Sequence, residues 1–162
     1  MDANNTPYIV YCHEWVEITD GTICCQQLSD DLTKTVTEPK VLFAASEAPW
    51  TTAHVIAEID RENNYITDGP FLYNLANSDT LLLWSSFKNG SYAIGQAISK
   101  NGILGPFVHI KEPLFEKDGG HGMVFRDKNN QLKLAIHTPN DSPNERPIFI
   151  DVEECDGFLK AK

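Results

Sequence analysis

One carboxylate is distinctive in this sequence because a rigid turn follows it immediately. Asp68 precedes Gly69 and Pro70 within the largely apolar stretch 64–73. Pro70 has a fixed φ and no N–H, and Gly69 lets the backbone approach a neighbour closely. The pattern therefore predicts a carboxylate held at a tight corner, where it could exchange a proton or accept hydrogen bonds. Taken alone, it also fits a turn aspartate that accepts hydrogen bonds from backbone amides.

Short apolar strands follow Asp68 at even spacing. The runs Thr80–Phe87 and Ser91–Ser99 come after the stretch that contains it, and turn residues separate them. Such spacing is typical of a meandering antiparallel sheet. No segment shows a helical periodicity strong enough to indicate an α/β fold.

This unit of strands recurs weakly along the chain. Val10, Leu83 and Leu134 fall at equivalent places in three successive units. A repeat of about 50 residues with four short strands is typical of β-propeller blades. We therefore predict an all-β fold of four-stranded antiparallel blades. It would comprise an incomplete blade over 1–45, an inserted excursion over 46–63, a complete blade over 64–117 and a last blade over 118–162.

The composition is that of a globular domain, with 41% hydrophobic and 22% charged residues. The formal net charge of −10 argues against nucleic acid and anionic membranes as partners, but it leaves a neutral sugar unaffected. No apolar run approaches the roughly 20 residues of a membrane helix. No basic segment with an apolar core follows Met1, so we expect no signal peptide in this chain. From this sequence as it stands we predict a cytoplasmic protein. An export signal would have to lie on an N-terminal half that precedes it.

The four cysteines lack the paired spacing of a zinc site. We expect them to be reduced residues of strands or of the core, with a bond between adjacent cysteines as the alternative. They are Cys12, Cys24, Cys25 and Cys155.

Three parts of the sequence together resemble glycoside hydrolase family 43, the five-bladed β-propellers that act on arabinose- and xylose-containing plant polysaccharides. They are Tyr11–Trp15, Thr67–Tyr73 with Leu83–Ser86, and Gly119–Phe125. They occur in the order and spacing of the family. The first unit lacks an inner strand, so the resemblance implies about two and a half of five blades, an incomplete propeller corresponding to the C-terminal half of such an enzyme.

The resemblance implies hydrolysis of glycosidic bonds with inversion, by a general base, a general acid and a third acidic group that tunes the acid. Inversion places the acid beside the leaving group and the base on the opposite face, where it activates water. Only the general-acid position has a counterpart here, at Asp68, where most of the family has Glu. The other two groups belong to inner strands upstream, so we expect the chain to be inactive alone.

Three roles for Asp68 therefore stay open: a general acid, a ligand to sugar hydroxyls, or a remnant. An acid must stay protonated near neutral pH, and this requires burial or a neighbouring carboxylate to raise its pKa.

Glu14 is a secondary catalytic candidate. It ends a strand beside Trp15, whose ring could stack on a sugar face, and His13 adds a polar contact. Alternatively, Trp15 packs beneath the excursion that contains Trp50, and Glu14 is solvated.

His121 lies between two glycines and resembles a family histidine that helps to hold a central cation, often calcium, through water. Calcium prefers oxygen ligands, so the resemblance does not imply direct coordination, and a structural histidine is the alternative. Arg146 resembles a last-blade arginine that binds sugar hydroxyls, for which its planar fork is suited. A surface ion pair is the alternative for Arg146.

Phe71 and Ser86 stand in the matched stretches and complete the substrate-binding candidates with His13, Trp15 and Arg146. The remaining histidines have no evident partner, and we expect them to be structural or exposed. They are His54, His109 and His137.

Three functional hypotheses follow from these patterns. The chain is an inactive part of a glycoside hydrolase, an enzyme assembled from several chains, or a carbohydrate-binding or structural module. Open strand edges and an apolar flank favour self-association or pairing with the N-terminal half. Two copies of this chain would still lack the base, so a homodimer should be a poor catalyst.

Overall fold

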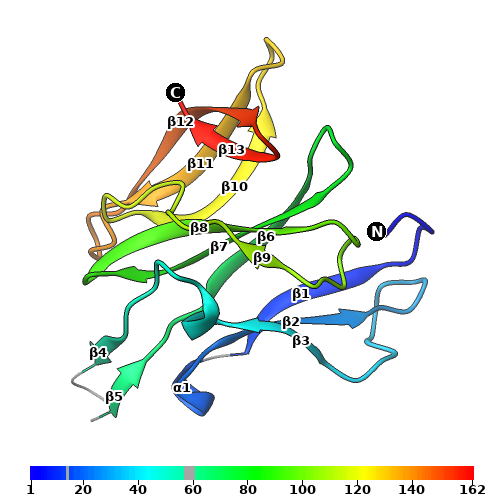
Figure 1. The fold of residues 1–162 in the computed structure, drawn as a ribbon, viewed down its shortest axis with the longest axis horizontal. Helices are drawn as coiled ribbons and strands as arrows, with labels where there is room; N and C mark the ends of the chain where they lie inside the picture. The colour runs from blue at the N-terminus through cyan, green and yellow to red at the C-terminus, as the bar shows by residue number, and fades with distance from the viewer. Residues whose placement is uncertain (14, 57–60) are drawn as a thin grey trace.

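The computed structural model describes residues 1–13, 15–56 and 61–162 (Figure 1). Glu14 therefore lies outside the described residues, as does part of the predicted excursion. Within the described part, the regular secondary structure is almost entirely β-strand, and all neighbouring strands of its sheets are antiparallel. No helix in the described ranges is long and apolar enough to cross a membrane.

The first sheet has three strands, in the order β1-β2-β3. They are β1 (Tyr8–His13), β2 (Thr22–Gln27) and β3 (Lys40–Ala44), and the short helix α1 (Trp15–Ile18) follows β1. The strand predicted to continue through Trp15 thus ends at His13. After β3 come the 3₁₀ turn η1 (Ala45–Glu47) and the two-stranded sheet of β4 (His54–Ile56) and β5 (Arg61–Asn64).

Two four-stranded sheets complete the described fold, in the orders β6-β7-β8-β9 and β10-β11-β12-β13. The central sheet comprises β6 (Asp68–Asn74), β7 (Thr80–Lys88), β8 (Ser91–Ser99) and β9 (Val108–His109). The last sheet comprises β10 (Gly120–Arg126), β11 (Leu132–Thr138), β12 (Arg146–Cys155) and β13 (Phe158–Ala161). Each connects its strands in sequence order, as the meander predicted from the spacing requires.

The three larger sheets stack one after another along the molecule (Figure 1). They form an open series of blades, not a closed ring, and the predicted all-β, propeller-type fold is confirmed. The central sheet is covered on both faces. Successive residues of a strand point to opposite sides, so β7 contributes side chains to both cores. Leu81 and Leu83 of β7 pack toward the last sheet, and Leu82 and Trp84 pack toward the first.

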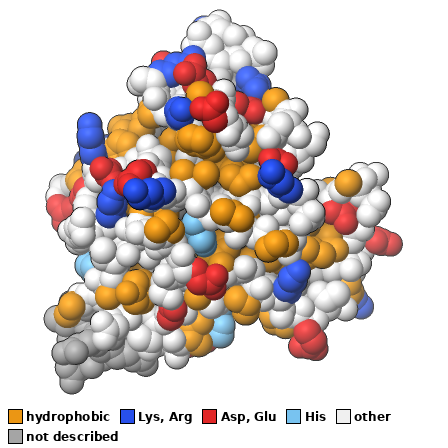
Figure 2. Space-filling model, viewed as in Figure 1, with side chains coloured by type: hydrophobic (Ala, Val, Ile, Leu, Met, Phe, Trp, Pro, Cys, Tyr) orange, Lys and Arg blue, Asp and Glu red, His pale blue; other side chains and the backbone are white. Residues whose placement is uncertain are grey.

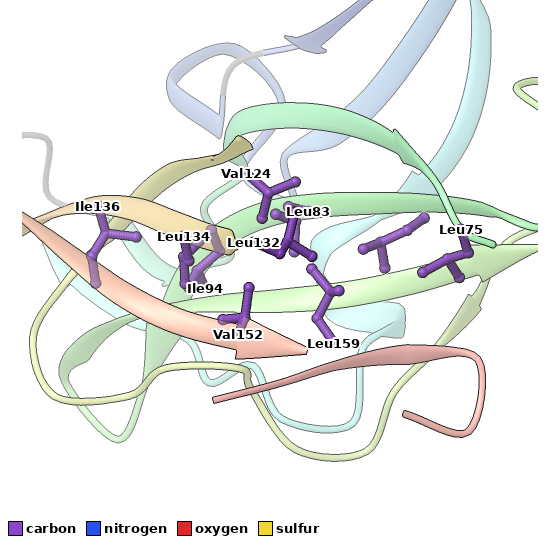
Figure 3. Close-up of a cluster of buried hydrophobic side chains, with 10 residues drawn as sticks. Leu75, Leu83, Ile94, Val124, Leu132, Leu134, Ile136, Val152 and Leu159 are labelled. Carbon is purple, nitrogen blue, oxygen red and sulfur yellow. The ribbon is translucent and has the colours of Figure 1, made fainter. Parts of the chain in front are cut away.

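The core between the central and last sheets is aliphatic (Figure 3). Leu83 and Ile94 of the central sheet meet Val124, Leu134 and Val152 of the last sheet, and Figure 3 shows them converging from facing strands. This contact fixes β6 relative to β10, the two strands that carry Asp68 and His121.

The second core, between the first and central sheets, is aromatic. Trp84 packs with Phe43 at a ring-centroid distance of 5.2 Å and with Trp50 at 5.0 Å. His109 lies against the same rings, 4.6 Å from Phe43, and burial lowers its pKa. His109 is therefore structural, as predicted.

Cys24, Cys25 and Cys155 carry free thiols in the structure, as predicted, and Cys12 lies on β1. Cys24 and Cys25 are buried on β2, and burial raises the pKa of Cys25 to about 11. A thiol with this pKa is protonated and inert at neutral pH.

Candidate active site

Asp68 and His121 meet at one end of the stacked sheets. Asp68 begins β6, and His121 is the second residue of β10. Oδ1 of Asp68 lies 3.2 Å from Nδ1 of His121, and both side chains are about half exposed. The prediction that the two side chains face one space is confirmed.

An irregularity at the start of each strand makes this contact possible. The register of β6 against β7 shifts between Asp68 and Phe71, and that of β10 against β11 shifts between Gly120 and Met123. A bulge of this kind redirects a side chain and often borders an active site. Both strands therefore turn their first residues toward the same point.

Gly69 is required for the close approach of the two strands. Its φ is +49°, and a Cβ added to it would lie 2.9 Å from the ring carbons Cγ and Cδ2 of His121. The predicted close backbone approach at this glycine is thus a contact with the imidazole of His121. A larger residue would displace the ring from Asp68.

Tyr92 of β8 is the second partner of Asp68. Its hydroxyl donates a hydrogen bond of 2.7 Å to Oδ2 of the carboxylate. The tyrosine is buried, and its burial together with the charge of Asp68 raises the pKa of the hydroxyl. Tyr92 therefore stays protonated and remains a donor at every physiological pH.

The backbone of His121 is fixed as well. Its N–H donates a 2.8 Å hydrogen bond to Oγ of Ser85, a buried residue of β7 that pairs with Asp68. The φ of His121 is +50°, a conformation that is uncommon for a residue with a side chain. Strain of this kind, held in place by neighbouring contacts, is frequent at functional sites.

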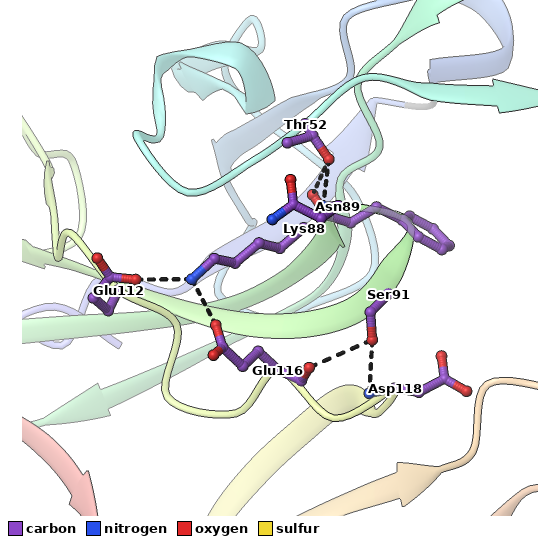
Figure 4. Close-up of polar contacts among 8 residues, drawn as sticks. Thr52, Lys88, Asn89, Ser91, Glu112, Glu116 and Asp118 are labelled. Carbon is purple, nitrogen blue, oxygen red and sulfur yellow. Dashed lines mark hydrogen bonds and ion pairs between the residues drawn. The ribbon is translucent and has the colours of Figure 1, made fainter.

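The loop before β10 is anchored to the turn between β7 and β8 (Figure 4). Lys88 forms ion pairs with Glu112 at 2.8 Å and with Glu116 at 2.6 Å. The N–H of Asp118 donates a 3.0 Å hydrogen bond to Oγ of Ser91. These contacts hold the approach to Gly120 and His121 in place.

Electrostatics at the pair favour an ionised carboxylate. Partial burial alone would raise the pKa of Asp68, but the hydrogen bonds from His121 and Tyr92 outweigh it and lower that pKa below its ordinary value. The hydrogen bond with Asp68 raises the pKa of His121. The two shifts have opposite directions, as expected for a carboxylate and an imidazolium that stabilise each other.

These shifts predict a pH window in which the pair stabilises the fold. A lowered carboxylate pKa gives stabilisation that is present above the ordinary value of 3.8 and is lost as the pH falls through the folded pKa. A raised histidine pKa gives stabilisation that is present below 6.5 and is lost as the pH rises through the folded pKa. Thermal unfolding from low to high pH should therefore show the largest difference between wild type and Asp68→Asn between pH 3.8 and 6.5. A difference independent of pH would contradict the ion pair.

His137 contributes a contact that the sequence did not predict. Its ring stacks on Tyr92 with a centroid distance of 5.6 Å, and its Nε2 lies 3.0 Å from Oδ1 of Asn140. It faces His121 at a centroid distance of 6.5 Å. His137 is a structural residue as expected, but it supports the tyrosine that holds Asp68.

Among the predicted site residues whose side chains the structure describes, His13, Phe71 and Ser86 form no hydrogen bond or ion pair with Asp68 or His121. Nε2 of His13 lies 3.0 Å from Oε2 of Glu17, and Trp15 begins α1. Phe71 is half-buried against the aliphatic core. Ser86 is fully buried, and its hydroxyl has no hydrogen-bond partner among the described residues. The binding roles of these residues stay predictions.

Arg146 begins β12, opposite Thr138, and is exposed. Its guanidinium donates to the backbone oxygens of Pro143 at 3.1 Å and Glu145 at 2.7 Å. In this position it organises its own loop, and it forms no ion pair with any residue that the structure describes. Its role in sugar binding stays a prediction.

The calcium ion implied by the family resemblance has no ready-made set of ligands here. Within the described ranges, no three His, Cys, Asp or Glu side chains lie close enough together to hold a metal ion. Nδ1 of His121 is directed to Asp68, and calcium requires six to eight oxygen ligands. A cation held by His121 through water therefore stays a prediction, and no step below involves a metal.

Solved structures with the same fold are β-propeller enzymes. The chain matches an endo-arabinase from Bacteroides thetaiotaomicron with 40% identity and a TM-score of 0.89, over 96% of this chain and 55% of that one. It matches a thermostable family-43 glycoside hydrolase with 23% identity and a TM-score of 0.80. It matches an endo-1,4-beta-xylanase from B. thetaiotaomicron with 24% identity and a TM-score of 0.75. Each of these two matches covers 99% of this chain and 55% of the other chain. No family model and no curated protein matches it.

These likenesses define the class of protein first: the chain has the fold of β-propeller glycoside hydrolases. More particularly, its solved neighbours include an endo-arabinase and a family-43 glycoside hydrolase, and family 43 is the family that the three sequence motifs resemble. The chain spans about half the length of each of these solved structures.

Proposed function

We propose that this chain forms the proton-donor side of a glycoside hydrolase active site, which cleaves O-glycosidic bonds of arabinose- or xylose-containing plant polysaccharides with inversion. The observation that carries the proposal is the 3.2 Å contact between Asp68 and His121. It brings two of the family-like motifs to a single half-exposed point. The 40% identity with an endo-arabinase supports an arabinose-containing substrate.

The base and the tuning carboxylate would come from propeller blades outside this chain. An inverting mechanism requires a second carboxylate across the sugar from the acid, with room for water. Among the residues described, Asp68 is the one carboxylate in contact with His121. The chain alone should therefore bind an oligosaccharide but not hydrolyse it.

Calorimetry and a reducing-sugar assay on the same samples test both parts of this proposal. Arabino-oligosaccharides and xylo-oligosaccharides should each be titrated into the chain, and the release of new reducing ends should be followed over hours. Binding without release is the expected result. Absence of binding to either series would overturn the proposed function, and turnover by the chain alone would overturn the need for an external base.

A non-catalytic half-propeller that binds carbohydrate as an oligomer is the second candidate function. One observation favours it: the lowered pKa of Asp68 keeps the carboxylate ionised, and an ionised carboxylate is a hydrogen-bond acceptor for sugar hydroxyls. Figure 2 shows Lys and Arg side chains interspersed with Asp and Glu among larger hydrophobic and uncharged areas, so a neutral ligand suits this face better than a polyanion.

The outer face of the last sheet favours association with a second copy of the chain. Inward and outward residues alternate along β10, where Val124 is buried and Met123 and Phe125 are exposed. Phe149 of β12 is 65% exposed and packs edge-on against Phe125, with ring centroids 5.7 Å apart. A contiguous apolar face of this kind is typical of an interface. We call Met123, Phe125 and Phe149 the outer apolar face.

Light scattering measures this association directly. The wild-type chain is expected to dimerise at micromolar concentration, and Phe149→Lys should shift it to the monomer because a charge would be buried in the interface. Val55→Lys, at a position that is 72% exposed on β4, is the matched control. A wild-type chain that stays monomeric at high concentration would exclude the oligomeric candidate.

A further inference from the structure

The first sheet has an apolar face of its own, at the opposite end of the series of sheets from the outer apolar face (Figure 1). Val10 of β1 packs toward the central sheet, so its neighbours Ile9 and Tyr11 point away from that sheet. Tyr11 pairs with Cys24 of β2, and Cys24 pairs with Val41 of β3. Ile9 is 42% exposed and Val41 is 55% exposed. We call Ile9, Tyr11 and Val41 the first-sheet face.

The outer apolar face of the last sheet has the same construction. Met123 of β10 pairs with Ala135 of β11, and Ala135 pairs with Phe149 of β12. Cross-strand partners of this kind have Cβ atoms about 4.5–5.5 Å apart on one side of the sheet. Each face therefore contains a row of side chains that spans three strands and includes one aromatic ring, from Tyr11 in the first sheet and Phe149 in the last.

Polar groups beside both rows already have partners within the chain. In the first sheet, the hydroxyl of Tyr11 donates a 2.7 Å hydrogen bond to Oε1 of Gln26. In the last sheet, Lys133, which pairs with Phe125 across the strands, forms an ion pair with Asp151. Covering the two faces would therefore remove apolar surface from water without leaving these polar groups unpaired.

The curvature of the chain indicates how two copies could fit together. The chain follows the endo-arabinase propeller with a TM-score of 0.89 and covers 55% of it. Two copies placed end to end along the same curve therefore contain slightly more chain than one such propeller. A contact between two different faces of a protein gives a ring if the rotation closes and a filament if it does not.

We propose that a second copy of this chain docks its first-sheet face on the outer apolar face, and that the same contact at the other end closes a ring of two copies. The inference rests on the second candidate function and deepens it, because it states which surface of the partner copy covers Met123, Phe125 and Phe149. A pair formed by two outer apolar faces would leave both first-sheet faces in water. The head-to-tail ring covers all four faces.

The ring also fixes where the two candidate sites lie. Asp68 and His121 meet where β6 and β10 begin. A rotation about the axis of a ring does not exchange its two ends. Both pairs would therefore lie at the same end of the assembly, one from each copy.

Light scattering on variants with opposite charges distinguishes this contact from a face-to-face pair. Val41→Lys and Phe149→Glu each introduce a charge into both contacts of the ring. Each variant alone should raise the dissociation constant by about ten- to hundredfold, because an unpaired charge would be buried. Salt of about 0.5 M screens the net charge of −10 on each copy, which otherwise opposes association.

An equimolar mixture of the two variants provides the decisive sample. In the mixed ring, one contact has the wild-type residues and the other brings the introduced lysine to the introduced glutamate. The dimer should therefore return at a concentration at which each variant alone is monomeric, and its return also shows that both variants are folded. Val55→Lys on β4, at a position that is 72% exposed, is the control and should dimerise as the wild type does.

Each alternative result would overturn the ring in a recognisable way. If Val41→Lys dimerises like the wild type while Phe149→Glu is monomeric, the outer apolar faces pair with each other. If the mixture stays monomeric, or if the wild-type mass rises beyond two copies with concentration, the head-to-tail contact is absent or does not close. A monomeric wild type would exclude the ring together with the oligomeric candidate. Calorimetry reports oligosaccharide binding separately, so a failure of the ring and a failure of the proposed glycosidase site are distinguishable.

Discussion

Asp68→Asn is expected to weaken the binding of arabino-oligosaccharides by about ten- to hundredfold. A hydrogen bond to a charged acceptor contributes about 1.5–3 kcal/mol, and each 1.4 kcal/mol corresponds to a factor of ten in affinity. The amide has the same size and can still accept from Tyr92, but it carries no charge for His121 or for a sugar hydroxyl. Calorimetry with the wild type and the variant at pH 6 measures the difference.

Glu153→Gln is the matched control for this change. Glu153 is an exposed carboxylate of β12 that pairs with Lys162, so its loss removes the same charge without touching the site. Equal weakening in both variants would show that overall charge, not the position of Asp68, controls binding. Equal affinities of wild type and Asp68→Asn would remove Asp68 from the sugar-binding surface.

Leu134→Ala is expected to lower the free energy of unfolding by about 2–5 kcal/mol, the usual cost of a cavity at a fully buried leucine. Leu134 is 0% exposed at the centre of β11, where it packs between the last and the central sheet (Figure 3). The cavity would also loosen the contact that aligns β10 with β6. The variant should therefore lose both stability and the Asp68–His121 contact.

Urea denaturation measures the first effect, and the pKa of His121 measures the second. Val108→Ala is the control, because Val108 is 70% exposed and its truncation should change the free energy of unfolding little. A Leu134→Ala variant that is as stable as Val108→Ala would contradict the account of how the two sheets are held together.

The sequence was sufficient for the fold class and for the central pair of the site. Turn residues and apolar runs at even spacing predicted antiparallel blades. The glycines beside Asp68 and His121 indicated two backbone corners, which the structure brings together. These predictions succeeded because turn residues and strand alternation are properties of residues that are neighbours in the sequence.

The partners of this pair could not be predicted in the same way. Tyr92 reaches Asp68 from two strands away, across β7, and this depends on the registers Asp68↔Ser85 and Ser86↔Ala93. A register error of one residue would turn Tyr92 to the other face of its sheet. The sequence placed Ser85 within one of the matched stretches and His137 among the histidines expected to be structural or exposed, but it did not specify which side chains make contact.

The protonation of Asp68 was the other point that the sequence left open. An acid role requires a raised pKa, and burial alone would have supplied it. The hydrogen bonds from His121 and Tyr92 reverse the direction, and neither is visible in the motif Asp68-Gly69-Pro70. The same motif is therefore compatible with a proton donor or with an ionised acceptor, depending on residues far from it in sequence.

The central claim is that an arabinose- or xylose-containing ligand binds where Asp68 and His121 meet. Amide chemical shifts of the chain titrated with an arabino-oligosaccharide test it most directly, because Gly69, Gly120 and His121 provide separate reporters at the site. We predict that these amides shift together and saturably, and that Asn74 at the far end of β6 does not. Shifts confined to Asn74 and its neighbours, or no saturable shift at the site glycines, would contradict the account.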